Sequence, residues 1–147
     1  MSEFHFQLKA NWNGGRLGKG EISSGNLQTA VSVPEDMGGP GTGTNPEEML
    51  LGAASTCYMI TLASVLENRK LPVTSLTLIT DGLLSSEGGL HFVSITHKPS
   101  ITLSLGVNEE QIEMSRKAAE RAEQACMISK ALRGNVTVHV EPQILVE

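Results

Sequence analysis

The two cysteines are the residues of this chain that are best suited to chemistry. Cys57 lies in the middle of an uncharged run, residues 49–66, and Cys126 lies in the last quarter of the 147 residues. A cysteine attacks an electrophile as the thiolate, and a thiol with an unperturbed pKa near 8.5 is only about 3% ionised at pH 7. Burial raises that pKa further. Unless another group counteracts burial, both cysteines are small buried hydrophobes.

Arg16 is the group that we expect to tune Cys57. It follows the turn pair Gly14-Gly15, and its permanently charged guanidinium can approach a thiolate and hold a carboxylate at the same time. A solvated turn residue is the simpler interpretation of its position. Position alone therefore makes Arg16 a candidate and no more.

A helix over residues 45–68 is expected to carry Cys57. Thr44 or Asn45 can cap it, Pro46 suits the first helical position, and two glutamates place negative charge at the positive end of the helix dipole. The uncharged run that follows predicts a helix buried on every side.

That run also has the length of a membrane span. Its 18 residues, 49–66, meet the threshold. However, the run contains Gly52 and several hydroxyl side chains and lacks basic flanks. We therefore expect the buried helix of a soluble protein and no membrane span.

Alternating apolar and polar residues predict strands around this helix. In the first strand, residues 3–12, the apolar residues share one face, which we expect to be half-buried. A long strand at residues 91–105 contains Pro99, which marks an edge or a bulge. Short turns and the lack of a parallel βαβ repeat indicate an α+β fold with antiparallel sheet. The remaining strands are expected at residues 19–23, 27–33, 73–84 and 136–140.

A second helix is expected to begin after the cap residue Asn108 and to end near Cys126. Small residues on one side of it permit close packing against the first helix. Packed helices stand about 8–10 Å apart, and a disulfide needs Cα atoms within about 7 Å. A reversible Cys57–Cys126 bond is therefore geometrically feasible.

The composition limits the classes of function. A chain of this length is expected to form one domain, residues 1–147. A net charge of −5 and an aromatic content of 3% argue against binding to nucleic acid or to an anionic membrane. No signal-peptide pattern is present, so a cytoplasmic location is the default expectation. The four isolated histidines lack metal-ligand spacing, so no metal site is expected.

Three stretches resemble the signature regions of one protein family. They are GGRLGKGEISS (residues 14–24), MGGPGTGTNPEEMLLGAASTCY (residues 37–58) and CMISKALRGNVTV (residues 126–138). In order and spacing they are similar to the OsmC/Ohr family of thiol peroxidases. The most specific pieces are NPEE with a cysteine ten residues after Glu47, and a second cysteine ahead of SKALRGN.

The resemblance implies an OsmC-like fold, with antiparallel sheets and two central helices, in an intertwined homodimer with sites at the interface. It implies an organic hydroperoxide reductase in which Cys57 attacks the peroxide and Cys126 resolves the sulfenic acid to a disulfide. Arg16 and Glu47 would form the activating pair. No bound cofactor is implied, because an external dithiol, typically a dihydrolipoyl group on a partner protein, reduces the disulfide.

This chain departs from the family pattern after the second cysteine. The hydroperoxide-resistance branch usually has Pro-Tyr there, whereas this chain has Met127-Ile128. GKGEIS (residues 18–23) leans toward the OsmC branch, while GGR and SKALRGN lean toward the hydroperoxide-resistance branch. The branch, the preferred peroxide and the reductant therefore stay open.

The spacing of Glu47 and Cys57 sets a geometric problem. Ten positions correspond to about 15 Å along a straight helix, and one arginine side chain spans about half of that. Either the helix is broken early or Glu47 acts across a dimer interface. We expect that the Arg16, Glu47 and Cys57 of one site do not all come from one chain.

Apolar side chains near the cysteines are expected to line the substrate site and to favour hydrophobic peroxides. The alternative function is a non-catalytic redox sensor, or an apolar-ligand-binding protein, with the same fold. The expected lining residues are Met49, Leu50, Met59, Met127 and Ile128.

Overall fold

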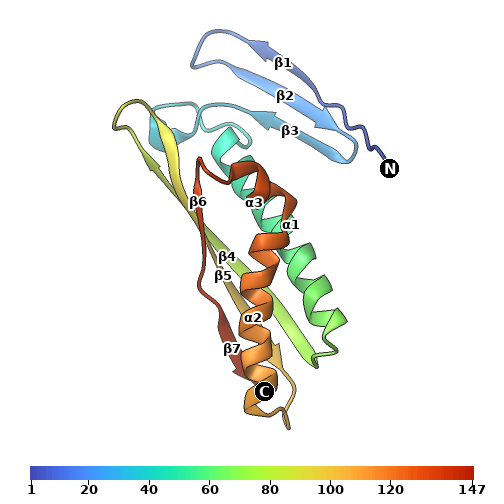
Figure 1. The fold of residues 1–147 in the computed structure, drawn as a ribbon. Coiled ribbons are helices and arrows are strands. Elements are labelled where there is room, and N and C mark those ends of the chain that lie inside the picture. Colours follow the sequence, from blue (N-terminus) through green and yellow to red (C-terminus); the bar gives the residue numbers. More distant parts are fainter. The chain divides into compact units, whose positions relative to one another are not determined.

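The computed structural model describes residues 1–147, which form two compact units, Met1–Leu50 and Leu51–Glu147 (Figure 1). Each unit has its own sheet, with three strands in the first and four in the second. The helix α1, Pro46–Asn68, begins in the first unit and continues in the second. The α+β class expected from the sequence is confirmed, and the single domain stays a prediction.

The first unit is an antiparallel meander with short turns. β1 (Lys9–Asn13) pairs with β2 (Lys19–Ser24), and β2 pairs with β3 (Leu27–Val31). Gly25 makes the turn from β2 to β3 with a φ of 57°, a conformation that glycine adopts without steric cost. A short 3₁₀ helix, η1 (Glu35–Met37), then leads toward α1.

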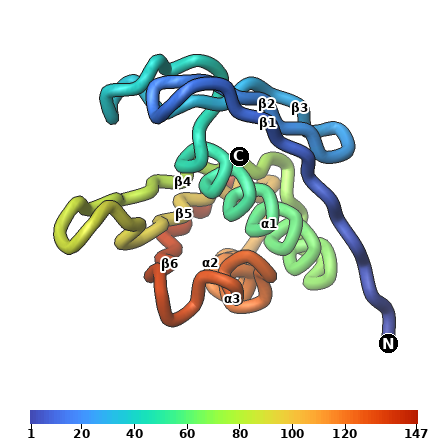
Figure 2. Tube along the Cα trace, turned by 90° about the horizontal axis from the view of Figure 1, so that it is seen from above, coloured from blue at the N-terminus to red at the C-terminus, as the bar shows by residue number.

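The predicted start of the first strand is wrong. β1 begins at Lys9 and not at residue 3, because β2 ends at Ser24 and earlier residues have no strand to pair with in this chain. They continue as an extended segment (Figure 2), in which Phe4 and Phe6 are 86% and 89% exposed. The face that we expected to be half-buried is exposed in the single chain.

The start and end of α1 agree with the expected helix over residues 45–68. The cap is Asn45, whose side-chain oxygen accepts the Glu48 N–H at 2.8 Å. Thr44, the other candidate, donates instead to the Glu48 carboxylate at 2.9 Å. The helix is unbroken over its whole length, which rules out the early break considered above.

α1 is buried along one stripe only, so the expected burial on every side is wrong for the single chain. The other faces remain open, and Ile60 is 66% exposed. By length and composition α1 is the one helix that could cross a membrane, with 22% of its apolar window buried. The buried stripe consists of Ala54, Tyr58, Leu62 and Leu66.

The second unit contains a mixed sheet. β4 (Val73–Ser85) and β5 (His91–Leu103) are antiparallel, whereas β6 (Thr137–Val140) and β7 (Gln143–Val146) both pair in parallel with β5. The parallel pairs differ from the expected antiparallel sheet, because the helices between β5 and β6 return the chain to the same end of the sheet. The sequence prediction lacks β7.

Pro99 lies neither at an edge of the sheet nor at a β-bulge of the β4–β5 pair, contrary to the expectation. It lies within β5 opposite Leu78 of β4. On the other side of β5, pairing with β6 stops at His97 and pairing with β7 starts at Ser100. Proline has no N–H to donate, and it occupies the gap where β5 has no ladder partner on that side.

Two helices follow the β4–β5 hairpin. α2 (Glu109–Ala125) starts with a capping box in which the side chains and backbone N–H groups of Asn108 and Gln111 pair reciprocally, at 2.9 and 3.0 Å. Cys126 then leaves the helical conformation, with a ψ of 123°, and α3 (Met127–Leu132) begins after it. The end of α2 agrees with the prediction, whereas α3 is absent from it.

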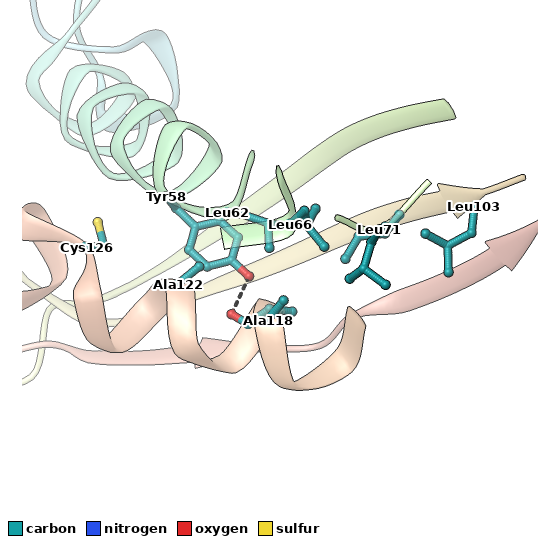
Figure 3. Packing of buried hydrophobic residues seen from close by; sticks show 10 residues of the cluster. Tyr58, Leu62, Leu66, Leu71, Leu103, Ala118, Ala122 and Cys126 are labelled. Carbon is teal, nitrogen blue, oxygen red and sulfur yellow. Dashed lines mark hydrogen bonds between the residues drawn. The ribbon is translucent and has the colours of Figure 1, made fainter. Parts of the chain in front are cut away.

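α1 and α2 lie side by side on one face of this sheet (Figures 1 and 2). The alanines of α2 leave room for Tyr58 of α1, whose hydroxyl donates to the Ala119 carbonyl at 2.8 Å (Figure 3). Burial, followed by the nearby acidic groups of Glu123 and Cys126, raises the pKa of Tyr58, so the phenol keeps its proton and this hydrogen bond. The core continues through Leu62, Leu66, Leu71, Ile101, Leu103, Ala118 and Ala122.

His97 is a polar residue enclosed in this core. Its ring is fully buried and stacks on Tyr58, with centroids 4.4 Å apart and planes 9° from parallel. Thr80 Oγ1 lies 2.9 Å from Nδ1, and Nε2 has no hydrogen-bond partner. Burial lowers the pKa of His97 from 6.5 to about 4, so the ring is neutral in the folded protein.

We expect acid to destabilise the protein through His97. Between pH 6.5 and 4 the unfolded chain binds a proton that the folded chain does not, so stability falls as the pH falls through this window. Chemical denaturation should show an extra loss of about 3 kcal/mol relative to His97→Phe as the pH falls to 4. His139→Phe, at an exposed histidine, serves as the control. Parallel pH curves for wild type and His97→Phe would contradict this assignment.

Candidate active site

The two cysteines meet where α1 approaches the break between α2 and α3. Cys57 is half-buried and precedes the core residue Tyr58 in α1. Cys126 is fully buried, and Figure 3 shows it at one end of the cluster that contains Tyr58. Cys57 packs against the core cluster that contains Cys126, and the Cys126 thiol is the neighbour that contributes most to lowering the Cys57 pKa. Both thiols are free. Their contact fits the sequence expectation that the two residues are close enough to form a disulfide.

The pKa of Cys57 is set by burial and by neighbouring neutral groups. Burial raises the pKa of the Cys57 thiol, but hydrogen bonds outweigh burial and lower the pKa below its ordinary value. In order of size, the donors are the Cys126 thiol, the backbone N–H groups of Ile128 and Met127, and the Thr61 hydroxyl. All four are neutral groups, so the thiolate is favoured here without the cation that the sequence reasoning required.

The pKa of Cys126 shifts in the opposite direction, above its ordinary value. Burial raises the pKa of its thiol, and the hydrogen bond to Cys57 raises it further. Bonds from Ser129 and from the Ile128 N–H only partly offset this increase. The pair therefore ionises in a fixed order: Cys57 becomes the thiolate while Cys126 keeps its proton.

Arg16 and Glu47 lie in the first unit. The Arg16 guanidinium is exposed and donates to the Met37 carbonyl at 2.9 Å. One carboxylate oxygen of Glu47, Oε2, is buried without a hydrogen-bond partner, a costly arrangement for a charged group. The predicted pairing of Arg16 with Glu47, and their action on Cys57, stay predictions.

The expected lining residues differ in exposure. Met127 is 70% exposed, whereas Met59 and Ile128 are half-buried. Ile128 also packs against the core next to the cysteines. Met49 and Leu50 are half-buried in the first unit. Ile128 is the one of these five residues that lies beside the cysteines, and the lining role of all five stays a prediction.

Sequence reasoning missed Thr61 and the two backbone N–H groups. Thr61 follows Cys57 by four positions, the spacing that places two side chains on the same side of a helix, so its position was a usable signal. The N–H groups of Met127 and Ile128 can act on Cys57 because the helix breaks at Cys126. No local sequence pattern predicts this break. No cluster of three or more His, Cys, Asp or Glu side chains that could hold a metal ion is present.

Residues 39–141 match the family model described as OsmC-like protein. The chain belongs to the OsmC-like family. The match includes both cysteines and Glu47, and Arg16 lies before it.

Relatives and solved structures of this family cover almost the whole chain. The uncharacterized protein YmaD of Bacillus subtilis (strain 168) is 43% identical over 98% of this chain and 97% of its own length. The organic hydroperoxide resistance protein OhrB of the same organism is 28% identical, over 92% of this chain and 96% of its own. An organic hydroperoxide resistance protein from Elizabethkingia anophelis is 26% identical, with a TM-score of 0.74 over 100% of both chains. The OsmC-like fold expected from the sequence is confirmed.

Proposed function

We propose that this protein is a thiol peroxidase that reduces organic hydroperoxides to alcohols. The observation that carries the proposal is the contact of two free cysteines whose pKa values shift in opposite directions. The Cys57 sulfur is favoured as the attacking thiolate, while the Cys126 thiol keeps its proton. Relatives named organic hydroperoxide resistance proteins support the substrate class.

The two cysteines and the hydroperoxide supply every atom and electron pair that the proposed reaction needs. The Cys57 thiolate attacks the terminal oxygen of the hydroperoxide, so that an S–O bond forms, the O–O bond breaks and an alkoxide leaves. Cys126 donates its proton to the alkoxide, which departs as the alcohol. The resulting Cys126 thiolate attacks the sulfenic acid on Cys57, and a disulfide forms with release of hydroxide.

An external dithiol completes the cycle. It exchanges with the Cys57–Cys126 disulfide and restores both thiols while it is itself oxidised to a disulfide. A dihydrolipoyl group on a partner protein is the reductant we propose. The half-buried Ile128 beside the cysteines favours peroxides with an apolar organic group over hydrogen peroxide.

We also propose that the working unit is a homodimer in which Arg16 and Glu47 complete the site. The buried Oε2 of Glu47 has no hydrogen-bond partner. A guanidinium can donate hydrogen bonds to a carboxylate and to a thiolate at the same time. The open faces of α1 and the exposed Phe4 and Phe6 provide apolar surface for a second copy.

Arg16→Ala is expected to raise the Cys57 pKa by about one unit beyond the value set by the neutral donors, equivalent to about 1.4 kcal/mol. Titration of the thiolate absorbance in the Cys126→Ser background isolates Cys57. Arg16→Lys, which keeps the charge but loses the fork, should give a smaller shift. An unchanged titration in Arg16→Ala would remove Arg16 from the site.

Turnover tests the proposed function. Purified protein with a dihydrolipoyl compound should consume cumene hydroperoxide much faster than the dithiol alone, and it should consume hydrogen peroxide more slowly. Consumption no faster than that of the dithiol alone would overturn the proposal.

A further inference from the structure

The two sulfurs of a Cys57–Cys126 disulfide would differ in their access to a reductant. Cys126 is 0% exposed and belongs to the core cluster, whereas Cys57 is only half-buried and packs against the edge of that cluster. The burial of Cys126 is complete within one chain, so association with another chain cannot expose it. A thiol that arrives from solvent can therefore reach Cys57 but not Cys126, unless the fold around Cys126 opens.

Backbone hydrogen bonds hold Cys126 in its buried position. Its N–H donates to the carbonyls of Ala122, at 2.9 Å, and Glu123, at 3.3 Å. Its own carbonyl accepts the Lys130 N–H at 3.0 Å. Movement of Cys126 to the surface would break these bonds, which join it to α2 and α3. Disulfide formation does not require such a movement, because Cys57 already packs against the cluster that contains Cys126.

The chemistry of exchange favours the opposite choice. In thiol–disulfide exchange the sulfur with the lower thiol pKa leaves more readily. Burial raises the pKa of Cys126, whereas the neutral donors outweigh burial at Cys57 and lower its pKa. A reductant that reached both sulfurs equally would therefore attack Cys126 and release Cys57. However, leaving ability only scales the rate of an attack, and a sulfur without accessible surface is not attacked. Access therefore decides.

We propose that the external dithiol attacks the Cys57 sulfur of the disulfide and that Cys126 is the leaving sulfur. The atom that takes oxygen from the hydroperoxide is then also the atom that the reductant attacks, and both reactants arrive at the same exposed side of the pair. This inference rests on the proposed function, whose reductive half it specifies. It also requires no local unfolding at Cys126 during the catalytic cycle.

The proposed exchange proceeds in two steps. A thiolate of the dithiol attacks the Cys57 sulfur, so that a mixed disulfide forms while the Cys57–Cys126 bond breaks, and Cys126 leaves with the electron pair and takes up a proton. The second thiolate of the dithiol then attacks the dithiol sulfur that is bound to Cys57. This attack releases Cys57 as the thiolate and closes the disulfide of the oxidised dithiol. Two electrons pass from the dithiol to the protein.

A monothiol tests the first step by itself, because it cannot carry out the second. The protein disulfide is formed with diamide, so no hydroperoxide is involved, and the folded oxidised protein is then treated briefly with 2-mercaptoethanol. Acid stops the exchange, and N-ethylmaleimide labels the freed cysteine in denaturant at low pH. Peptide mapping then shows which cysteine carries each group. The shares at successive times are extrapolated to zero time, because the freed Cys126 thiolate can later move the adduct.

We expect mercaptoethanol on Cys57 and maleimide on Cys126 at least about tenfold more often than the reverse. The same oxidised protein in concentrated urea is the matched control, because both sulfurs are accessible there and the two products should form in comparable amounts. An adduct mainly on Cys126, or equal shares in the folded and the unfolded protein, would overturn the proposal. A folded protein that forms no disulfide with diamide, or whose disulfide resists the monothiol, would also overturn it.

The mapping and the turnover assay separate this inference from the proposed function. A protein that gives the Cys57 adduct but consumes no hydroperoxide would refute the proposed function and leave the order of exchange intact. A protein that consumes hydroperoxide but gives the adduct on Cys126 would overturn the inference alone.

Discussion

Cys57→Ser is expected to lower the rate of organic hydroperoxide consumption at least about 1000-fold, because the sulfur that attacks the peroxide is replaced by a hydroxyl with no base to ionise it. Serine is slightly smaller than cysteine and keeps the helix, so the fold should survive. Cumene hydroperoxide consumption with a dithiol in excess measures the effect.

Two controls show whether the loss of activity in Cys57→Ser comes from the missing sulfur. The Cys57→Ser protein should unfold at a midpoint close to that of wild type, because Cys57 is only half-buried and belongs to the periphery of the core. In the same protein, Cys126 should remain unreactive toward hydroperoxide, since burial raises the pKa of its thiol. Substantial peroxide consumption by Cys57→Ser would assign the attack to another group.

Cys126→Ser is expected to abolish multiple turnovers through the disulfide while leaving the first attack in place. A serine hydroxyl can still donate to the Cys57 thiolate, but it cannot form the disulfide. We expect steady-state turnover to fall at least about 100-fold, while one equivalent of hydroperoxide is still consumed. Mass spectrometry should find Cys57 as the sulfenic acid and, with excess peroxide, as the sulfinic acid.

Cys126→Ala distinguishes resolution from hydrogen bonding. It removes the donor to Cys57 as well as the resolving sulfur, so its first attack at neutral pH should be slower than that of Cys126→Ser. Full steady-state turnover by Cys126→Ser would show that the external dithiol reduces the sulfenic acid directly, and Cys126 would then lose its resolving role.

The sequence was sufficient for the elements whose signals are local. The cap at Asn45, the uncharged run that follows it, and the capping residue Asn108 predict α1 and α2 almost residue by residue. The contact of Cys57 with Cys126 follows from small residues on facing helices. These features depend on neighbouring residues along the chain and on one packing contact.

Features that depend on partners distant in sequence were not predictable in this way. The strand register that leaves residues 3–8 unpaired is set by the length of β2, and the place of Pro99 is set by a gap between β6 and β7. The Met127 and Ile128 N–H groups that follow the break at Cys126 help to lower the Cys57 pKa, so part of the stabilisation of the thiolate comes from neutral groups. The direction of a backbone N–H group cannot be predicted from a periodic pattern of side chains in the sequence.

The most direct test of the two-cysteine mechanism is a stoichiometric one. Reduced protein is mixed with one equivalent of cumene hydroperoxide in the absence of dithiol, and the free thiols, the alcohol and the cross-linked peptides are quantified. We predict the loss of both thiols of the chain, one equivalent of alcohol and a Cys57–Cys126 disulfide within one chain. Intact hydroperoxide with two free thiols, or oxidation of Cys126 while Cys57 stays free, would contradict the account.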